Sequence, residues 1–440
     1  QRFAVLYSES GDSLTGALFL DGRYVAAGGH PVAFTWRPDS IRRSATIDGL
    51  FLESETVLAV GRRACVVRLT VENRSGAARD VRVGFGVKAA VTSNLGNWDH
   101  AIAPAEGDNT AETDPSRGAV LFRARHSQAV SLQGIGPDAD TVLDAHVGVA
   151  RRLAAGGVLR VTFVDVIDAT AEGARAVYDA LLAAGDAVFT AARDEWNREL
   201  AAAFTPGNDR FSGSLPVLET DNAALQALYW NGALGALWFK REFAHAVLPR
   251  VYTTLMPRYW PTLTWLWDYE LGSLAHALLD PQVMRAQLEH WMGWDVQTFM
   301  ATDWLTGRGV GHWYAVNDHA MVKLVRDYVR WTGDRGWLEA AVPGPDGSPR
   351  RVLDAALGYA RAWHRRATGS GLADYGSMSN LLECLPAYAH EVAGPNALNV
   401  VGLAAAAELL RAAGRADETA ALDAEAAAIV AALRPLYVEG

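Results

Sequence analysis

The chain has 440 residues, of which half are apolar and a fifth are charged, the balance of a globular protein large enough for two hydrophobic cores. The formal net charge is −10 and no basic run is present, so we expect no nucleic-acid partner. No apolar stretch approaches the roughly 18 residues of a membrane span, so we expect no membrane partner. Cys65 and Cys384 fall in regions of different character and have no metal-type spacing, so no disulfide framework is expected.

The first and last residues bear on completeness and compartment. No signal peptide is visible, which slightly favours the cytoplasm. However, the chain opens with Gln1 inside an expected strand and stops at Gly440 without a closing element. We therefore expect part of a longer polypeptide, completed by further residues of the same polypeptide or by a second chain, and leave the compartment open.

Residues 1–168 have the pattern of an antiparallel β-sandwich. Short runs rich in Val, Leu, Phe and Thr alternate with turn clusters at near-regular spacing. Residues 65–71 (CVVRLTV) alternate cleanly and are followed by the turn 72–76 (ENRSG). The sequence therefore predicts many short strands packed as two sheets.

From Asp168 onward the pattern becomes helical. Residues 169–220 are expected to form a helical linker, and 221–440 the first part of an all-α toroid of paired helices, an (α/α)6 barrel. Apolar spacing predicts helices over roughly 264–279, 281–299, 316–332, 350–367, 379–392, 396–413 and 417–433. A six-hairpin toroid needs about a dozen helices, so the toroid is expected to be incomplete in this chain.

Aromatic and acidic residues concentrate between Tyr252 and Trp337, where nine of the 15 tryptophans lie. Flat aromatic faces stack on the C–H surfaces of sugars, while carboxylates and amides bond their hydroxyls. A single tryptophan here, such as Trp331, is more simply explained as core. The run 259–270 (YWPTLTWLWDYE) favours a carbohydrate cleft, because it mixes aromatics with acids just before an expected helix.

Several motifs in this half resemble a known group of enzymes. Residues 265–268 (WLWD), followed by a helix ending in 277–281 (ALLDP), resemble the Trp-Asp motif of the trehalase and processing α-glucosidase group, glycoside hydrolase families 63 and 37 and their bacterial relatives. Residues 316–334, ending in Thr-Gly-Asp, resemble the next helix of that group. The resemblance implies a β-sandwich followed by an (α/α)6 barrel, and gives Trp267 and Asp268 a role in holding sugar hydroxyls.

The resemblance also suggests the catalytic acid. Residues 369–375 (GSGLADY) are similar to the stretch that carries the general acid, although strict alignment places that acid at Ala373, one position before Asp374, and the arginine usual shortly afterwards is missing. Asp374 is the first candidate, with Glu383 and Glu391 as competitors. Asp374 could instead fix a turn, and Asp268 could cap a helix. In the group the base is a glutamate far downstream, which would lie beyond Gly440.

The predicted function is hydrolysis of a glycosidic bond by an exo-acting, inverting enzyme that uses two carboxyl groups, with α-glucoside-like substrates and no cofactor or metal. The catalytic candidates are Asp374 and Glu383. The expected substrate-binding residues are Tyr259, Trp260, Trp265, Trp267, Asp268, Asp303, Trp304, His312, Trp313, Asp318, Glu391 and Asn396. Two alternatives stay open: a polysaccharide lyase and a carbohydrate-binding protein without catalysis.

Overall fold

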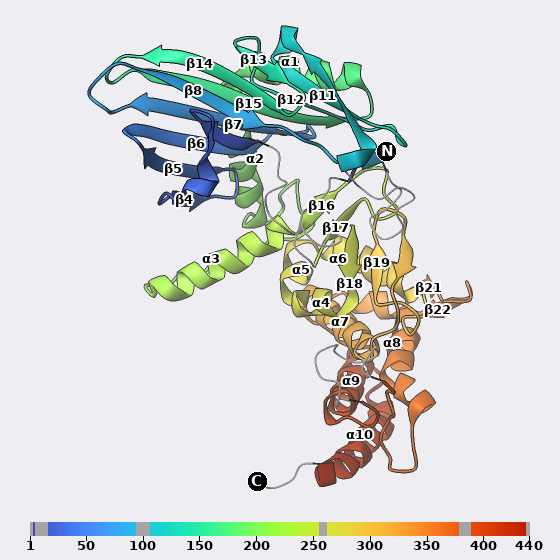
Figure 1. The fold of residues 1–440 in the computed structure, drawn as a ribbon. Coiled ribbons are helices and arrows are strands. Elements are labelled where there is room, and N and C mark those ends of the chain that lie inside the picture. Colours follow the sequence, from blue (N-terminus) through green and yellow to red (C-terminus); the bar gives the residue numbers. More distant parts are fainter. Residues whose placement is uncertain (1–2, 5–15, 94–105, 255–261, 378–388, 437–440) are drawn as a thin grey trace. The chain divides into compact units, whose positions relative to one another are not determined.

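The computed structural model describes residues 3–4, 16–93, 106–254, 262–377 and 389–436 (Figure 1). The described residues up to Leu200 form one compact unit, and those from Ala201 onward form a second. The first unit is built mainly of β-strands and the second mainly of helices. A large β-sheet domain followed by a helical part was expected from the sequence, and this coarse organisation is confirmed.

The first unit is a sandwich of two antiparallel sheets. One has eight strands in the order β10-β11-β12-β15-β7-β6-β5-β4, and the other has five in the order β13-β14-β8-β2-β3. Phe85 of the smaller sheet stacks on Phe163 of the larger, with ring centroids 4.9 Å apart, in the core between them. The strands are β2 (Ala17–Leu20), β3 (Arg23–Tyr24), β4 (Ala33–Trp36), β5 (Ile41–Ile47), β6 (Leu50–Leu58), β7 (Ala64–Asn73), β8 (Arg79–Gly86), β10 (Asn109–Asp114), β11 (Ala119–Ala124), β12 (Val130–Gly134), β13 (Thr141–Leu143), β14 (His146–Leu153) and β15 (Val158–Asp168), with a separate pair β1 (Phe3–Ala4) and β9 (Thr92–Ser93).

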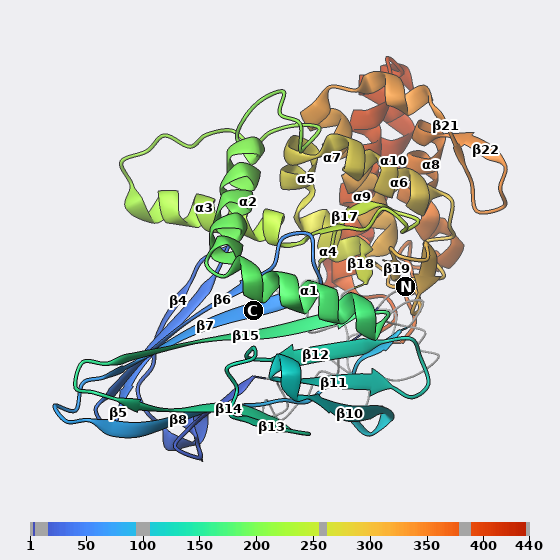
Figure 2. The same ribbon diagram turned by 90° about the horizontal axis from the view of Figure 1, so that it is seen from above.

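Both faces of the larger sheet are buried around β15, as the alternation along this strand shows. Val161 and Phe163 point into the space between the sheets, whereas Val164 and Val166 join a second cluster on the opposite face. Helix α1 (Ala171–Ala184) covers that face over β12 and β15 (Figure 2). Gly185 has φ 52° and ends α1, and α2 (Ala187–Ala203) follows.

The helical unit is organised around α7 (Asn317–Thr332). This helix packs against α4 (Leu266–Leu271), α5 (Ser273–Leu279), α6 (Pro281–Met292), α8 (Val352–Ala360) and α9 (Ala393–Ala412), and α9 pairs with α10 (Thr419–Leu433). Gly333, with φ 73°, ends α7 where the sequence predicted a stop. None of the described helices is both long and apolar enough to cross a lipid bilayer.

Several predicted helices are shorter in the structure. The helix expected over 281–299 ends at Met292, with Gly293 following, and the one expected over 350–367 becomes α8 and a 3-10 turn over Ala362–Arg366. Most of the helix predicted over 379–392 lies outside the described residues, and 389–392 are not helical. Short antiparallel strands stand in regions expected to be helix or loop: β16 (Lys240–Glu242), β17 (Arg250–Tyr252), β18 (Leu263–Trp265), β19 (Ala301–Asp303), β20 (Arg308–Val310), β21 (Ala341–Pro343) and β22 (Pro349–Arg351).

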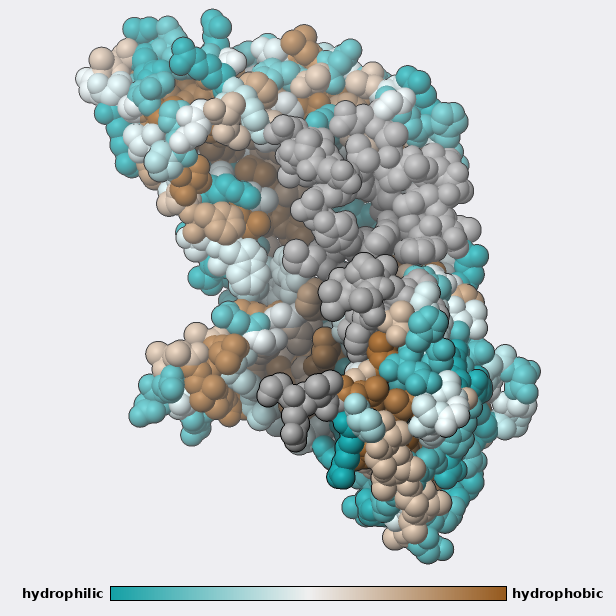
Figure 3. Space-filling view, turned by 60° about the horizontal axis from the view of Figure 1, so that its bottom comes forward, coloured by the Kyte–Doolittle hydropathy of each residue, from teal (hydrophilic) through white to brown (hydrophobic). Residues whose placement is uncertain are grey.

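The first helix of this unit, α3 (Ala223–Trp238), has no charged residue and buries little of its surface. Leu228 is 69% exposed, and Leu225, Trp230 and Trp238 are exposed as well. Apolar side chains gather on this helix at the lower left of Figure 3. Such a surface favours packing against another apolar surface.

Candidate functional site

The predicted WLWD motif lies at the junction between β18 and α4. Trp265 ends the strand, and its backbone N–H donates to the hydroxyl of Thr254. The buried Trp265 ring stacks on Tyr314, with centroids 6.5 Å apart and planes 21° apart, and Trp267 packs against the same cluster. The structure therefore brings the WLWD motif together with the segment 311–316, which is far from it in the sequence.

The segment 311–316 also contributes a ring to a second aromatic stack. Trp313 stacks on Tyr375, with centroids 6.1 Å apart, and the guanidinium carbon of Arg366 lies 3.8 Å from the centroid of the Trp313 ring. The buried indole Nε1 of Trp313 has no hydrogen-bond partner among the described residues. We call Trp265, Tyr314, Trp313 and Tyr375 the aromatic row.

Two acids on first helical turns hold their protons unusually tightly. Asp268 lies on the first turn of α4 and Asp318 on the first turn of α7, and these two helices pack together. Burial raises the pKa of each carboxyl to about 6. For Asp318, burial outweighs both the hydrogen bond from Gln297 Nε2 (2.7 Å) and the positive charges of Arg366 and Arg365.

The first catalytic candidate, Asp374, has the opposite electrostatics. Its side chain is 42% exposed. It accepts hydrogen bonds from the backbone N–H of Gly376 (2.7 Å) and pairs with His390 Nδ1 (3.2 Å). These bonds, that of Gly376 first, lower the pKa of Asp374. A general acid must hold a proton at the working pH, so the surroundings of Asp374 favour the role of an ionised carboxylate rather than the predicted acid.

Glu391 lies in the same loop as His390, which has a left-handed backbone conformation with φ 64°. The Glu391 carboxylate accepts hydrogen bonds from the hydroxyls of Ser370 (3.0 Å) and Thr368. These contacts join the segment after the 3-10 turn to the residues before α9. Glu391 therefore lies next to the Asp374 loop.

Three of the predicted substrate-binding residues have structural partners. The Asn396 amide is fully buried and bonds both backbone groups of Ala373 (2.8 and 3.0 Å) and the carbonyl of Val392 (3.0 Å), so it holds the Asp374 loop in place. Asp303 is 3% exposed and accepts from the backbone of Leu305 and Thr306 in the β19–β20 turn. Trp304 is buried in an apolar cluster of the unit. The side chains of these three residues have partners within the unit, and their role in substrate binding stays a prediction.

The other predicted residues are placed differently. His312 is exposed, with its ring edge-on to Tyr314 at a centroid distance of 5.2 Å. Tyr259, Trp260 and Glu383 lie outside the described residues, so their predicted roles stay predictions. Among the residues that the structure describes, no group of three or more His, Cys, Asp and Glu side chains could hold a metal ion.

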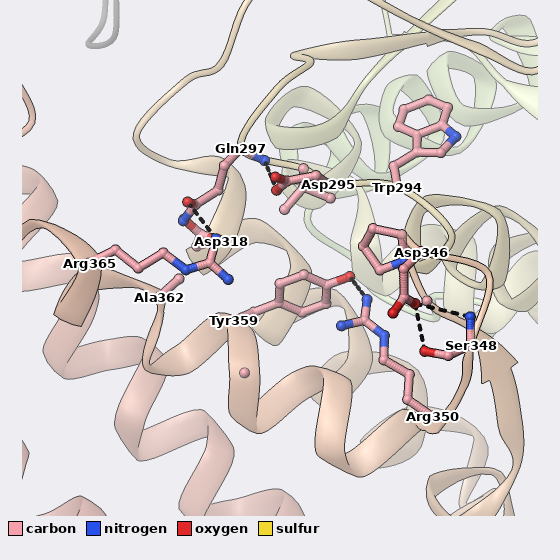
Figure 4. Close-up of a pocket in the computed structure, with 14 residues that line it drawn as sticks. Trp294, Asp295, Gln297, Asp318, Asp346, Ser348, Arg350, Tyr359, Ala362 and Arg365 are labelled. Atoms are coloured by element: carbon pink, nitrogen blue, oxygen red, sulfur yellow. Dashed lines mark hydrogen bonds between the residues drawn. The ribbon is translucent and has the colours of Figure 1, made fainter.

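Asp318 also lines a cavity of about 440 Å³ (Figure 4). Its walls come from residues 294–297 after α6, from the β21–β22 hairpin and from α8 with the following 3-10 turn. Tyr359, Arg350 and Arg365 contribute polar groups. Sequence reasoning missed these three residues because they belong to no motif, and only the turn at 344–348 (GPDGS) marks the region. We call this cavity the Tyr359 pocket.

Comparisons with known proteins show the class of fold. No family model and no curated protein matches the sequence. Among solved structures, a bacterial glucoamylase complexed with acarbose matches 91% of this chain with a TM-score of 0.58 at 10% identity. A putative kojibiose phosphorylase from the human microbiome matches 96% with a TM-score of 0.51 at 8% identity. The chain spans 58% and 59% of those two chains.

These two likenesses support an (α/α)6 glycoside-hydrolase-like fold, the class that the sequence resemblance implied. They do not single out the trehalase and processing α-glucosidase group, so that narrower assignment stays a prediction. The predicted incompleteness of the toroid and the predicted domain limits also stay predictions.

Proposed function

We propose that the protein is a carbohydrate-active enzyme, an exo-acting and inverting glycoside hydrolase of α-glucoside-like substrates. The observation that carries the proposal is the carboxyl of Asp318, whose pKa is raised to about 6 beside an aromatic row and a cavity. A glycosidic oxygen is a poor leaving group until it is protonated, and a carboxyl with this pKa still holds its proton in weakly acidic solution. The fold is compatible with this chemistry, although fold alone does not define a reaction.

In the proposed mechanism Asp318 protonates the leaving oxygen. An ionised carboxylate on the other face of the sugar removes a proton from water, which attacks the anomeric carbon with inversion. The lowered pKa of Asp374 suits this base better than the acid role predicted from the sequence. Inversion requires about 6.5–9.5 Å between the two carboxyl groups. Glu383, outside the described residues, remains the competing candidate.

Sugar binding is assigned to the WLWD motif, and the buried aromatic row is assigned the role of supporting it. Trp267 and Asp268 would hold sugar hydroxyls, as the family resemblance implies. Stacking of pyranose C–H groups on the partly exposed ring of Trp267 would orient the sugar. Asp268 would be a binding acid, because its raised pKa lets it donate as well as accept a hydrogen bond.

The test is hydrolysis of a panel of α- and β-linked disaccharides, with the product anomers followed by NMR and with phosphate present or absent. We expect inverted product, and a loss of about 10²–10⁴-fold in kcat for Asp318→Asn. Asp417→Asn is the matched control, since Asp417 is an exposed acid on another turn.

Three results would contradict the proposal. Full activity of Asp318→Asn would remove the acid assignment. Strict dependence on phosphate would favour a phosphorylase, the activity named for one of the matched structures. An ultraviolet-absorbing unsaturated product would favour the lyase alternative.

A further inference from the structure

We propose that the Tyr359 pocket is a binding site for a neutral sugar residue, which makes the substrate an oligosaccharide that extends from Asp318 into this pocket. The inference rests on the proposed function for the role of Asp318, and on the pocket itself for the chemistry of the ligand. Its volume of about 440 Å³ lies in the range of about 300–1,000 Å³ that ligand pockets occupy.

Hydrogen bonds hold the side chains that line the pocket in place. Nη2 of Arg350 donates to the carbonyl of Met292 (2.8 Å) and to the hydroxyl of Tyr359 (2.8 Å), which ties the β21–β22 hairpin to the end of α6 and to α8. Gln297 donates to Asp318 and accepts from Arg365 Nη1 (3.0 Å), which joins the opposite wall to the 3-10 turn. Figure 4 shows Tyr359 between these two groups. Side chains fixed in this way favour binding, because little ordering remains to be done.

These hydrogen bonds leave donor and acceptor atoms without partners among the described residues on both sides of Tyr359. Arg350 Nη2 makes both of that residue's hydrogen bonds, so Nη1 has no partner among the described residues. The Tyr359 hydroxyl accepts from Arg350 and has no acceptor of its own there. In the same described part of the chain, three carboxylates each keep one oxygen without a donor: Asp295 Oδ2, Asp318 Oδ1 and Asp346 Oδ2.

This mixture selects the chemical class of ligand. A carboxylate or phosphate ligand would face the three acids, and an amine would face the guanidinium groups of Arg350 and Arg365. A sugar hydroxyl both donates and accepts, so neighbouring hydroxyls can bond a carboxylate and a guanidinium together. The exposed Asp346, whose carboxylate is held by Ser348, and the buried Tyr359 supply one acceptor and one donor that conservative substitutions can remove.

The experiment is calorimetric binding of thiomaltose, a neutral disaccharide analogue that hydrolysis cleaves poorly, to the whole protein. Glucose, glucuronate and glucosamine are compared with one another as single rings. We expect Tyr359→Phe and Asp346→Asn each to weaken thiomaltose binding about tenfold, the effect of losing one hydrogen bond in a binding site. We expect glucose to bind more tightly than either charged ring. Asp417→Asn is the control and should bind like the wild type, and thermal unfolding checks that each variant is folded.

The outcomes separate this inference from the proposed function. Binding that both variants weaken, in a protein that hydrolyses nothing, supports the pocket and removes the hydrolase. Hydrolysis with unchanged KM and unchanged thiomaltose binding in both variants removes the pocket and leaves the hydrolase. Tighter binding of glucuronate or glucosamine than of glucose also overturns the inference, because it assigns a charged ligand.

Discussion

The sandwich unit and the helical unit differ in what they do with the polar groups that they bury. In the sandwich, Asn73 donates to three backbone carbonyls and accepts from Ser75, and Asp165 accepts from Ser131. In the helical unit, the Tyr269 hydroxyl, His276 Nδ1 and Trp313 Nε1 are buried without a partner among the described residues, whereas in the described sandwich only Asp108 Oδ2 is.

The difference separates scaffold from site. Buried polar groups are normally hydrogen-bonded, because each unpaired one costs roughly 1–3 kcal/mol. The described part of the sandwich pairs nearly all of its buried side-chain polar atoms, and this pairing stabilises it. Several unpaired buried polar groups in one unit are typical of a region that meets water or a ligand. The helical unit is therefore where chemistry is expected.

The largest effect on the scaffold should come from its apolar core. Leu132 is fully buried between the larger sheet and α1. Leu132→Ala should lower the free energy of unfolding by about 2–5 kcal/mol, because it leaves a cavity in a packed core. Denaturant unfolding measures this change. Activity per folded molecule should stay at the wild-type value. A lower value would mean that the core of the sandwich contributes to catalysis.

Each unit buries one asparagine that bonds a loop, so the two units can be compared directly. Asn73 and Asn396 are both fully buried, and each bonds the backbone of a loop. Asn73→Ala and Asn396→Ala should each cost about 1–3 kcal/mol, because carbonyls lose their donors. Only Asn396→Ala should also lower kcat, since it holds the Asp374 loop. Equal kcat for the two variants would contradict this assignment.

A pH-dependent effect is expected at one acid of the sandwich, Asp165. Burial raises the pKa of Asp165 to about 6 from 3.8, so the folded sandwich binds this proton more tightly than the unfolded chain does. Its burial therefore costs little below pH 3.8, and the cost grows as the pH rises through 6. Asp165→Asn should raise the unfolding free energy by about 1–3 kcal/mol at pH 8 relative to pH 4, measured by thermal melts. A pH-independent difference would contradict the shift, and hydrolysis should not change.

Much of the architecture follows from local pattern. Alternation predicted the strands of the sandwich, and Gly333 predicted the end of α7. The helix predicted from residue 281 begins there as α6, and the Asp280 side chain makes no cap bond to it. The carboxylate instead accepts from Ser212, Arg250 and Tyr252. Those partners come from distant segments, which local pattern does not reveal.

The candidate site was predictable only in part. The dense aromatic and acidic composition of the WLWD run predicted a motif for sugar binding. The protonation of Asp318 depends on burial by residues far away in the chain, and the pocket around Tyr359 forms from three separated segments. Asn396 hydrogen-bonds the backbone of Ala373, which only the folded chain brings near it. Asp303 bonds the backbone of Leu305 in its own turn.

The most direct test of the account is the pH dependence of kcat/KM for hydrolysis, measured for the wild type, Asp318→Asn and Asp165→Asn. With Asp318 as the acid, wild-type activity should fall as the pH rises through about 6, because the acid loses its proton. Asp318→Asn should lose about 10²–10⁴-fold in kcat/KM, and its activity should no longer fall as the pH rises through about 6. Asp165→Asn should keep the wild-type kcat/KM and the wild-type dependence on pH. If the kcat/KM of Asp318→Asn still fell as the pH rises through about 6, the account would be contradicted.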